Sequence, residues 1–144
     1  MSLNLIPGAD ITSSALTAER MRMEVIANNI ANVNSTSGDG GGVYQRRVPI
    51  FDAVFKDALG GPQADGLAGV KIEEIALDGR DPLMVYAPYH PHADKTTGML
   101  MTPNISPMEE MVDMITATRA YEANLSVVKQ SKGMAERTIT MFKN

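Results

Sequence analysis

The feature that most constrains the fold is a pair of long helical segments at the two ends of the chain. Over residues 107–142, apolar side chains recur every three or four positions and no proline follows Pro107, which predicts one uninterrupted helix. A shorter segment, from Asp10 to Val33, has the same spacing. Helices that supercoil around one another bury stripes of this kind. We therefore expect a protein that is built to pack against other helices.

Neither terminal helix should be stable alone, because ordering a backbone costs about 1–2 kcal/mol per residue and burying one apolar stripe does not return that much. At about 1.5 Å per residue, the last helix would reach roughly 54 Å and the first roughly 36 Å. The longer helix therefore extends past its partner in the chain. Its stripe continues there through Ile139 and Phe142, so we expect another chain to cover it.

The two stripes define a set of candidate residues for contacts between subunits. Asn29 lies at the margin of its stripe, where a polar side chain can fix the register of packed helices. Alternatively, the asparagines at 28, 29, 32 and 34 simply end the helix, because asparagine is a poor helix former. The set is Leu16, Met23, Ile26, Asn29, Ile30 and Val33 from the first helix, and Met111, Met114, Tyr121, Leu125, Val128, Ile139 and Phe142 from the last.

Glycine and proline divide the chain into three parts. Ten of the twelve glycines and six of the eight prolines lie between Asn34 and Ser106. This shift separates a first helix (1–34), an irregular insert (35–105) and a last helix (106–144). The last boundary is the sharpest, because Ser106, Pro107 and Glu109 have the N-cap, N1 and N3 residue types of a capping box.

The insert has the composition of short strands joined by turns. The stretch from Val43 to Phe55 is rich in strand-forming residues but contains Pro49, so it predicts an edge strand or an extended arm. Shorter apolar or alternating runs occupy 70–73, 83–86 and 99–101, and turn residues at 94–98 separate the last two. We expect a small β-hairpin or a three-stranded sheet, preceded by a flexible joint or exposed loop at 35–42.

The composition excludes several classes of protein. A net charge of −4 and a pI of about 5.1 give no reason to expect nucleic acid or an anionic membrane as a partner. No run of 18 apolar residues is present, so we expect no membrane insertion. The first ten residues lack the basic and apolar regions of a cleaved signal peptide. Cysteine is absent, which excludes disulfides, thiolate metal ligands and cysteine nucleophiles.

The strongest suggestion of an enzyme is the run His90, His92 and Asp94, which is similar to the His-x-His-x-Asp ligand run of metallo-hydrolases. A catalytic zinc needs about three protein ligands. The chain has only these two histidines, and it has Lys95 where that run normally continues with a histidine. A solvated turn is the better interpretation. We expect no catalytic residue, no metal and no cofactor.

Two stretches near the ends of the chain carry a family resemblance. Residues 27–34 read Ala-Asn-Asn-Ile-Ala-Asn-Val-Asn, and residues 114–124 read Met-Ile-Thr-Ala-Thr-Arg-Ala-Tyr-Glu-Ala-Asn. The first resembles the N-terminal signature of the bacterial flagellar axial proteins, the rod and hook family, and the second resembles the C-terminal signature. Within that family, the short length and the segments 85–94 and 103–105 most resemble a proximal rod protein.

The resemblance implies a structural subunit of the flagellar basal-body rod. Such subunits self-assemble into a helical tube, with their terminal helices packed around the export channel. The implied partners are the proximal and distal rod proteins, the adaptor between rod and membrane ring, and the flagellar type III export apparatus. The implied location is the periplasmic part of the basal body, reached in an unfolded state and without a cleaved signal peptide. Phe51 and Phe55 are similar to the element that docks early subunits at the export gate, although a buried strand edge explains both equally well.

Together these observations predict a mainly α fold. Long N- and C-terminal helices should pack as a coiled-coil-like pair, with a small irregular β-hairpin insert between them. Three alternatives stay open at this point. They are another short rod protein of the same family, a soluble coiled-coil adaptor, and a metal-dependent hydrolase using His90, His92 and Asp94.

Overall fold

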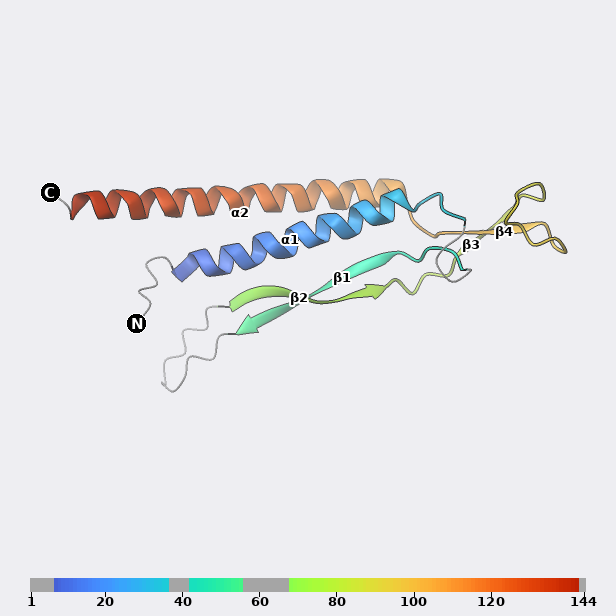
Figure 1. Cartoon of the computed structure of the whole chain (residues 1–144), viewed down its shortest axis with the longest axis horizontal. Coiled ribbons are helices and arrows are strands. Elements are labelled where there is room, and N and C mark those ends of the chain that lie inside the picture. The colour runs from blue at the N-terminus through green and yellow to red at the C-terminus, as the bar shows by residue number, and fades with distance from the viewer. Residues whose placement is uncertain (1–6, 37–41, 56–67, 143–144) are drawn as a thin grey trace.

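The computed structural model describes residues 7–36, 42–55 and 68–142. Within these residues the element order is α1 (Pro7–Ala31), β1 (Arg47–Phe55), β2 (Ala68–Leu77), β3 (Leu83–Tyr86), β4 (Met99–Thr102) and α2 (Pro107–Met141). The molecule is elongated. The two helices run in opposite directions, α1 lies between α2 and the β1–β2 pair, and β3 and β4 project beyond one end of the helices (Figure 1). The expectation of a mainly α chain with a β insert is confirmed.

Helix α2 begins where its capping signal predicts. The Ser106 side chain accepts a hydrogen bond from the Glu109 N–H at 3.4 Å, and Pro107 occupies the first turn, where its missing N–H is not needed. The second half of the expected capping box is replaced by an ion pair, because the Glu109 carboxylate contacts the Arg80 guanidinium at 3.2 Å. The helix then continues without interruption to Met141, and Phe142 is its C-cap.

Helix α1 differs from its predicted bounds at both ends. It begins at Pro7 rather than Asp10, since proline suits the first turn of a helix. It ends at Ala31, so Val33 lies in the following turn and not on the helix as predicted. In this turn the Asn32 side chain donates to the Asn28 carbonyl at 2.8 Å, the local bonding that makes asparagine suited to helix ends.

The described residues of the insert form two separate antiparallel hairpins, where a single hairpin or a three-stranded sheet was expected. The strand predicted from Val43 begins at Arg47 and pairs with β2, with a bulge between Ile50 and Phe51. Strand β3 occupies the predicted residues 83–86 and pairs with β4. The turn at 94–98 closes with a bond from the Gly98 N–H to the Asp94 carbonyl, and Gly98 has a φ of +69° that disfavours other residues.

Side chains of helix α1 bond backbone groups near both ends of the β1–β2 hairpin. At one end the Ser14 hydroxyl accepts from the Val70 N–H at 3.1 Å, and a Cβ at Gly69 would lie 3.2 Å from that hydroxyl. At the other end the Asn29 amide bonds both backbone groups of Arg47. Ser14 and Asn29 are about 22 Å apart along the helix. Side-chain bonds of this kind occupy strand edges that would otherwise pair with another chain.

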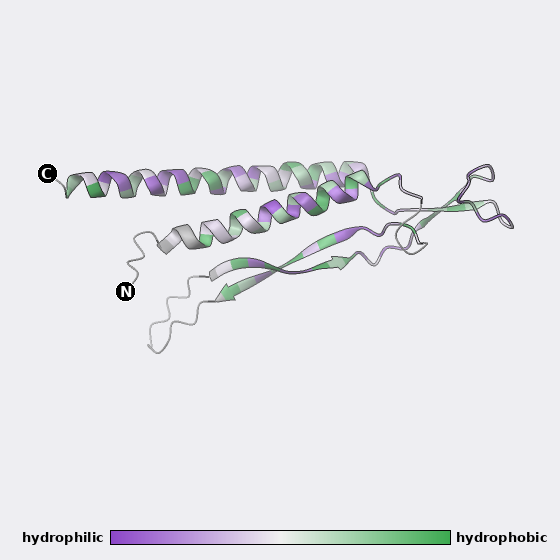
Figure 2. Cartoon of the chain, in the orientation of Figure 1, coloured by the Kyte–Doolittle hydropathy of each residue, from purple (hydrophilic) through white to green (hydrophobic). Residues whose placement is uncertain are grey.

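The apolar core is small and lies mainly between the two helices. Ala18, Val25 and Ile26 of α1 and Ala117 of α2 are buried there, while Leu100 and Ile105 are buried near the second hairpin. Both helices mix polar and apolar residues along their length (Figure 2). Among the described residues, no helix combines the length and apolar character needed to cross a membrane.

Candidate functional site

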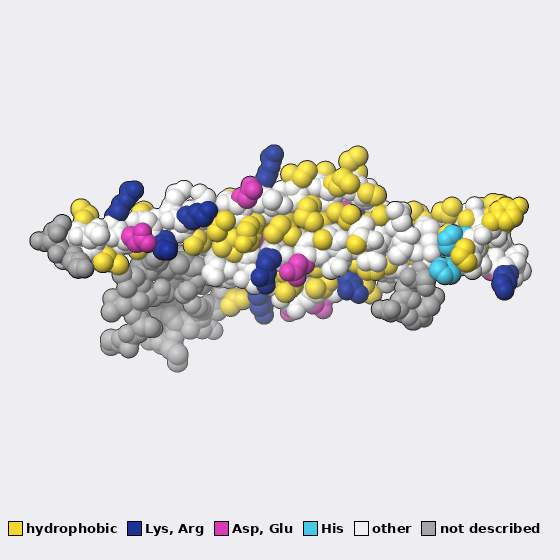
Figure 3. All heavy atoms as spheres, turned by 45° about the horizontal axis from the view of Figure 1, so that its top comes forward, with side chains coloured by type: hydrophobic (Ala, Val, Ile, Leu, Met, Phe, Trp, Pro, Cys, Tyr) yellow, Lys and Arg dark blue, Asp and Glu magenta, His cyan; other side chains and the backbone are white. Residues whose placement is uncertain are grey.

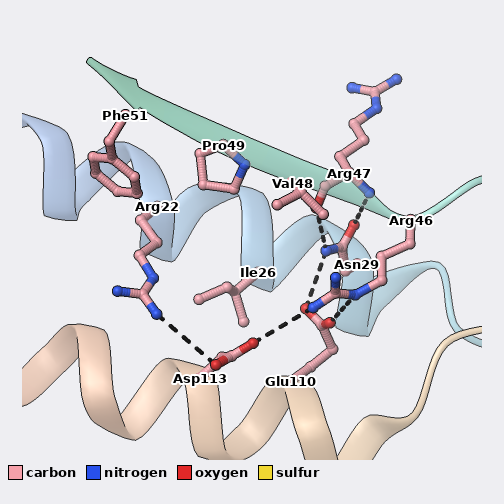
Figure 4. A pocket seen from close by; sticks show the side chains of 10 residues that line it. All are labelled: Arg22, Ile26, Asn29, Arg46, Arg47, Val48, Pro49, Phe51, Glu110 and Asp113. Atoms are coloured by element: carbon pink, nitrogen blue, oxygen red, sulfur yellow. Dashed lines mark hydrogen bonds and ion pairs between the residues drawn. The ribbon is translucent and has the colours of Figure 1, made fainter. Parts of the chain in front are cut away.

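A buried polar cluster joins the two helices to the β1–β2 hairpin (Figure 4). At its centre is the carboxylate of Glu110, which is fully buried in the first turns of α2. One carboxylate oxygen accepts from the Arg46 Nε at 2.6 Å, and the other accepts from the Asn29 side-chain amide at 3.0 Å. We call Asn29, Arg46 and Glu110 the polar clasp. A buried charge is tolerated only when it is paired and hydrogen-bonded in this way.

Asn29 uses its whole side-chain amide within the clasp. Its nitrogen also donates to the Arg47 carbonyl at 2.9 Å, and its oxygen accepts from the Arg47 N–H at 3.0 Å and from the Tyr44 hydroxyl at 2.9 Å. Burial raises the pKa of Tyr44 above its usual value, although the nearby positive charge of Arg47 partly offsets this rise. Asn29 therefore fixes the axial position of α1 against both α2 and the first residues of β1.

Arg46 extends the clasp outward to two further carboxylates. Its terminal nitrogens lie 3.3 Å from the Asp78 carboxylate and 3.4 Å from the Asp113 carboxylate. Asp113 also faces Arg22 of α1 at 3.8 Å. Burial alone would lower the pKa of Arg46, but the hydrogen bonds and negative charges of Glu110 and Asp78 together outweigh it and raise that pKa. The guanidinium thus stays charged and ties the end of β2 to the start of α2.

The clasp forms one wall of a pocket of about 250 Å³ between α1, α2 and β1. Val48, Pro49 and Phe51 line the opposite side, on the strand that crosses over α1 in Figure 4. The pocket is therefore half polar and half apolar. Phe51, one of the two residues of the proposed export element, keeps 40% of its surface exposed here, and the side chain of Phe55 lies outside the described residues.

The structure separates the predicted contact residues into three groups. Ile26 and Asn29 are buried within this chain. Met111, Ile139 and Phe142 are exposed. The remaining residues are half-buried, and they are Leu16, Met23, Ile30, Val33, Met114, Tyr121, Leu125 and Val128.

An apolar surface on α2 was missed by the sequence analysis. Glu110 and Ala117 mark the inner face of the helix, which packs against α1. The opposite face of the first turns is also apolar, with exposed fractions from 51% to 72%. We call it the exposed stripe, and it consists of Met108, Met111, Val112 and Ile115. Figure 3 shows hydrophobic side chains gathered over this part of the molecule.

The far end of α2 has no helical partner in the described chain. With 35 residues against 25, α2 is longer than α1 by about 15 Å. Figure 1 shows α2 continuing past the beginning of α1. Ile139, Met141 and Phe142 are exposed there by 55%, 80% and 88%. This matches the placement expected for the projecting end of the longer helix.

His90, His92 and Asp94 lie in the loop between β3 and β4. The Asp94 carboxylate accepts from the Thr96 N–H at 2.8 Å, and this bond leads the contacts that lower its pKa. The His92 ring bonds the Thr36 hydroxyl at 2.9 Å. Within residues 7–36, 42–55 and 68–142, no three histidine or acidic side chains are placed to share a metal ion.

Comparisons with known proteins match both ends of the chain. Residues 10–38 match the family described as flagella basal body rod protein, and residues 96–141 match the flagellar basal body rod FlgEFG protein C-terminal family. The first match contains Asn29 and the second contains Glu110.

Whole-length relatives give the same result. The chain is 39% identical to the flagellar basal-body rod protein FlgC of Aquifex aeolicus, over 98% of this chain and 99% of that protein. It is 34% identical to FlgC of Bacillus subtilis, over 93% and 95% of the two chains. It is 36% identical to FlgC of Salmonella typhimurium, over 92% and 93%.

Proposed function

Because this chain belongs to the FlgC family of flagellar basal-body rod proteins, we propose that it joins its neighbours in the rod through the exposed apolar surfaces of α2. The family makes it a structural subunit of the bacterial flagellar basal-body rod. The observation that carries the proposal is that the first turns of α2 carry exposed apolar side chains on the face opposite to the one that packs against α1.

The exposed stripe and the projecting end of α2 both support contacts between subunits. A helix that packs on one side only carries polar residues on the other. Here the outward face of the first turns holds Met108, Met111, Val112 and Ile115 instead, and methionine suits surfaces that must adapt to a partner. Covering these residues would stabilise an assembly by the apolar area removed from water. We propose that they pack against helices of other rod subunits as the tube forms around its channel.

The polar clasp has a mechanical role in this proposal. It connects α1, α2 and the β1–β2 hairpin through groups that are buried and hydrogen-bonded. A rod that transmits torque needs its inner helices and outer elements to turn together. We propose that Asn29, Arg46 and Glu110 hold the hairpin in a fixed position on the helices under load, and that no catalytic step is involved.

We extend the proposal to partners and export. The other proximal and distal rod proteins, and the adaptor to the membrane ring, would contact surfaces left exposed by self-assembly. The subunit would reach the periplasm through the flagellar type III export apparatus without a cleaved signal peptide. Phe51 and Phe55 form the candidate export element, and Phe51 is exposed beside the register shift between β1 and β2.

Replacement of the chromosomal gene by variants tests the proposal. Deletion should abolish swimming and extracellular filaments, and the wild-type gene should restore both. Ile115→Asp should fail to restore them, because assembly would bury a charge in an apolar contact. Thr116→Asp is the matched control, since Thr116 is exposed one position further along the same helix. Normal swimming with Ile115→Asp would contradict the proposed surface.

A further inference from the structure

Two exposed surfaces with complementary features lie on opposite sides of the molecule. One is the exposed stripe on the outward face of α2. The other is the outer face at the end of β2, where Ile75 and Leu77 are exposed by 44% and 60%. Their neighbours Ala76 and Asp78 are half-buried, and the Asp78 carboxylate bonds Arg46 on the side of the helices. Because side chains alternate along a strand, Ile75 and Leu77 point away from the helices.

The two surfaces occupy the same level along the long axis. Arg46 bridges Asp78, directly after β2, to Glu110 and Asp113 in the first turns of α2. Figure 1 shows α1 lying between the hairpin and α2. The surfaces therefore face away from each other and cannot meet within one chain. Two copies stacked side by side in the same orientation would bring the stripe of one onto β2 of the next.

Charges beside the two apolar surfaces are also complementary. Arg119 is exposed on α2 one turn after Ile115, and Glu73 is exposed on β2 two residues before Ile75. The strand and the helix run in opposite directions, so both surfaces change from apolar to charged in the same direction along the molecule (Figure 1). Leu77 and Glu73 are separated by about 13 Å along the strand. Val112 and Arg119 are separated by about 10 Å along the helix.

We propose that the exposed stripe of one subunit packs on the outer face of β2 in a second copy of this chain, with Arg119 beside Glu73. This inference rests on the proposed function and adds which surfaces meet. The contact joins two different surfaces, so it does not close into a pair and can repeat from copy to copy. The four side chains of the stripe expose on the order of 400 Å² together, about half of one partner's share of a standard interface. The contact therefore forms in an assembly and not between dilute copies.

Disulfide cross-linking tests this contact cleanly, because the natural chain has no cysteine. Copies carrying Ile75→Cys and copies carrying Ile115→Cys are expressed together, basal bodies are isolated, and a mild oxidant is added. We expect a cross-linked dimer of this chain only when both variants are present. A chain carrying both substitutions should give a ladder of higher oligomers. Thr116→Cys with Ile75→Cys is the matched control and should cross-link several-fold less.

The outcomes separate this inference from the proposed function. Basal bodies that contain both variants but no 75–115 link would overturn the inference and leave the function intact. A 115–115 link, or a link only to another rod protein, would also overturn it. Absence of the wild-type chain from basal bodies would overturn both. If the cysteine variants fail to incorporate, Leu77→Cys with Val112→Cys repeats the test.

Charge exchange provides a second measurement that needs no cysteine. Arg119→Glu should reduce swimming several-fold, because it places a second carboxylate beside Glu73. Adding Glu73→Lys to the same chain should restore swimming. Failure of the double variant to improve on Arg119→Glu, with both present in basal bodies, would overturn the proposed contact.

Discussion

Replacing Asn29 with leucine should destabilise the folded chain more than any change of similar size on the surface of α1. Leucine has the same number of side-chain heavy atoms as asparagine and the same branch at Cγ, so the change removes the hydrogen bonds but keeps the shape of the side chain. Four bonds are lost, two with the Arg47 backbone and one each with Glu110 and Tyr44. The Glu110 carboxylate is fully buried and would lose one of its two partners.

The size of the effect follows from the groups left without partners. Each buried donor or acceptor that loses its partner costs about 1–3 kcal/mol, and more if it is charged. The Arg47 groups and Tyr44 are only partly buried, so water can replace part of their lost bonds. We therefore count Glu110 in full and the equivalent of one further group. The expected loss is about 3–5 kcal/mol, a large part of the 5–15 kcal/mol that typically stabilises a domain.

Urea unfolding of the purified full chain, followed by far-ultraviolet circular dichroism, measures this loss. Asn28→Leu is the matched control, because Asn28 is exposed on the preceding position of α1. The control should stay within about 0.5 kcal/mol of the wild type, as surface substitutions usually do. A free energy of unfolding for Asn29→Leu within about 1 kcal/mol of the control would refute the clasp as a stabilising element.

Three further outcomes follow from the structure. Gly98→Ala should destabilise the β3–β4 hairpin by about 1–2 kcal/mol, because the φ of Gly98 is +69° and the new Cβ would lie 2.9 Å from the Tyr86 ring. Faster hydrogen exchange of the β4 amides should report this loss of stability. Burial alone would raise the pKa of Asp78, but the hydrogen bond from the Arg80 N–H and the contact with Arg46 hold that pKa low. The ionised carboxylate therefore stabilises the fold at neutral pH, and this stabilisation is lost as the pH falls below about 4. Asp78→Asn should flatten the acid side of the curve of stability against pH. His92→Ala should swim normally, because it loses one exposed bond to Thr36, and complete loss of motility would revive a metal role.

Local patterns predicted the elements well where the determining residues are close in the chain. The Ser106-Pro107 start of α2 and the bounds of β3 follow from contacts within a few residues. The start of β1 was placed too early at Val43, because residue preference does not show where pairing with a distant strand begins. Pairing partners also lie far apart, so the sequence left a single hairpin and a three-stranded sheet as equal alternatives.

The polar clasp was only partly predictable. Asn29 was singled out because a polar residue interrupts an apolar stripe, and the structure gives it a register-fixing contact inside the chain. Glu110 was not proposed as a contact residue, although it shares a helical face with Ala117 and could have been recognised by that spacing. Arg46 reaches Glu110 across 64 residues, and no local pattern reveals such a pairing.

The exposed stripe was missed for a different reason. The sequence analysis assigned the apolar residues of the last helix to one face, and it included Met111 but not Met108, Val112 or Ile115. In the first turns of α2 the outward face is apolar, whereas the inner face contains the charged Glu110. A hydrophobic pattern read over the whole helix does not show the outward apolar face, because that face becomes charged from Arg119 onward.

Hydrogen exchange of the free chain and of the same chain in isolated rods tests the central claim most directly. We claim that the surfaces of α2 left open in one chain are covered by other subunits. The amides of residues 132–142 should therefore exchange rapidly in dilute solution and become strongly protected in the rod, while those around Glu110 are protected in both. Equal protection of residues 132–142 in the free chain and in the rod would contradict the account.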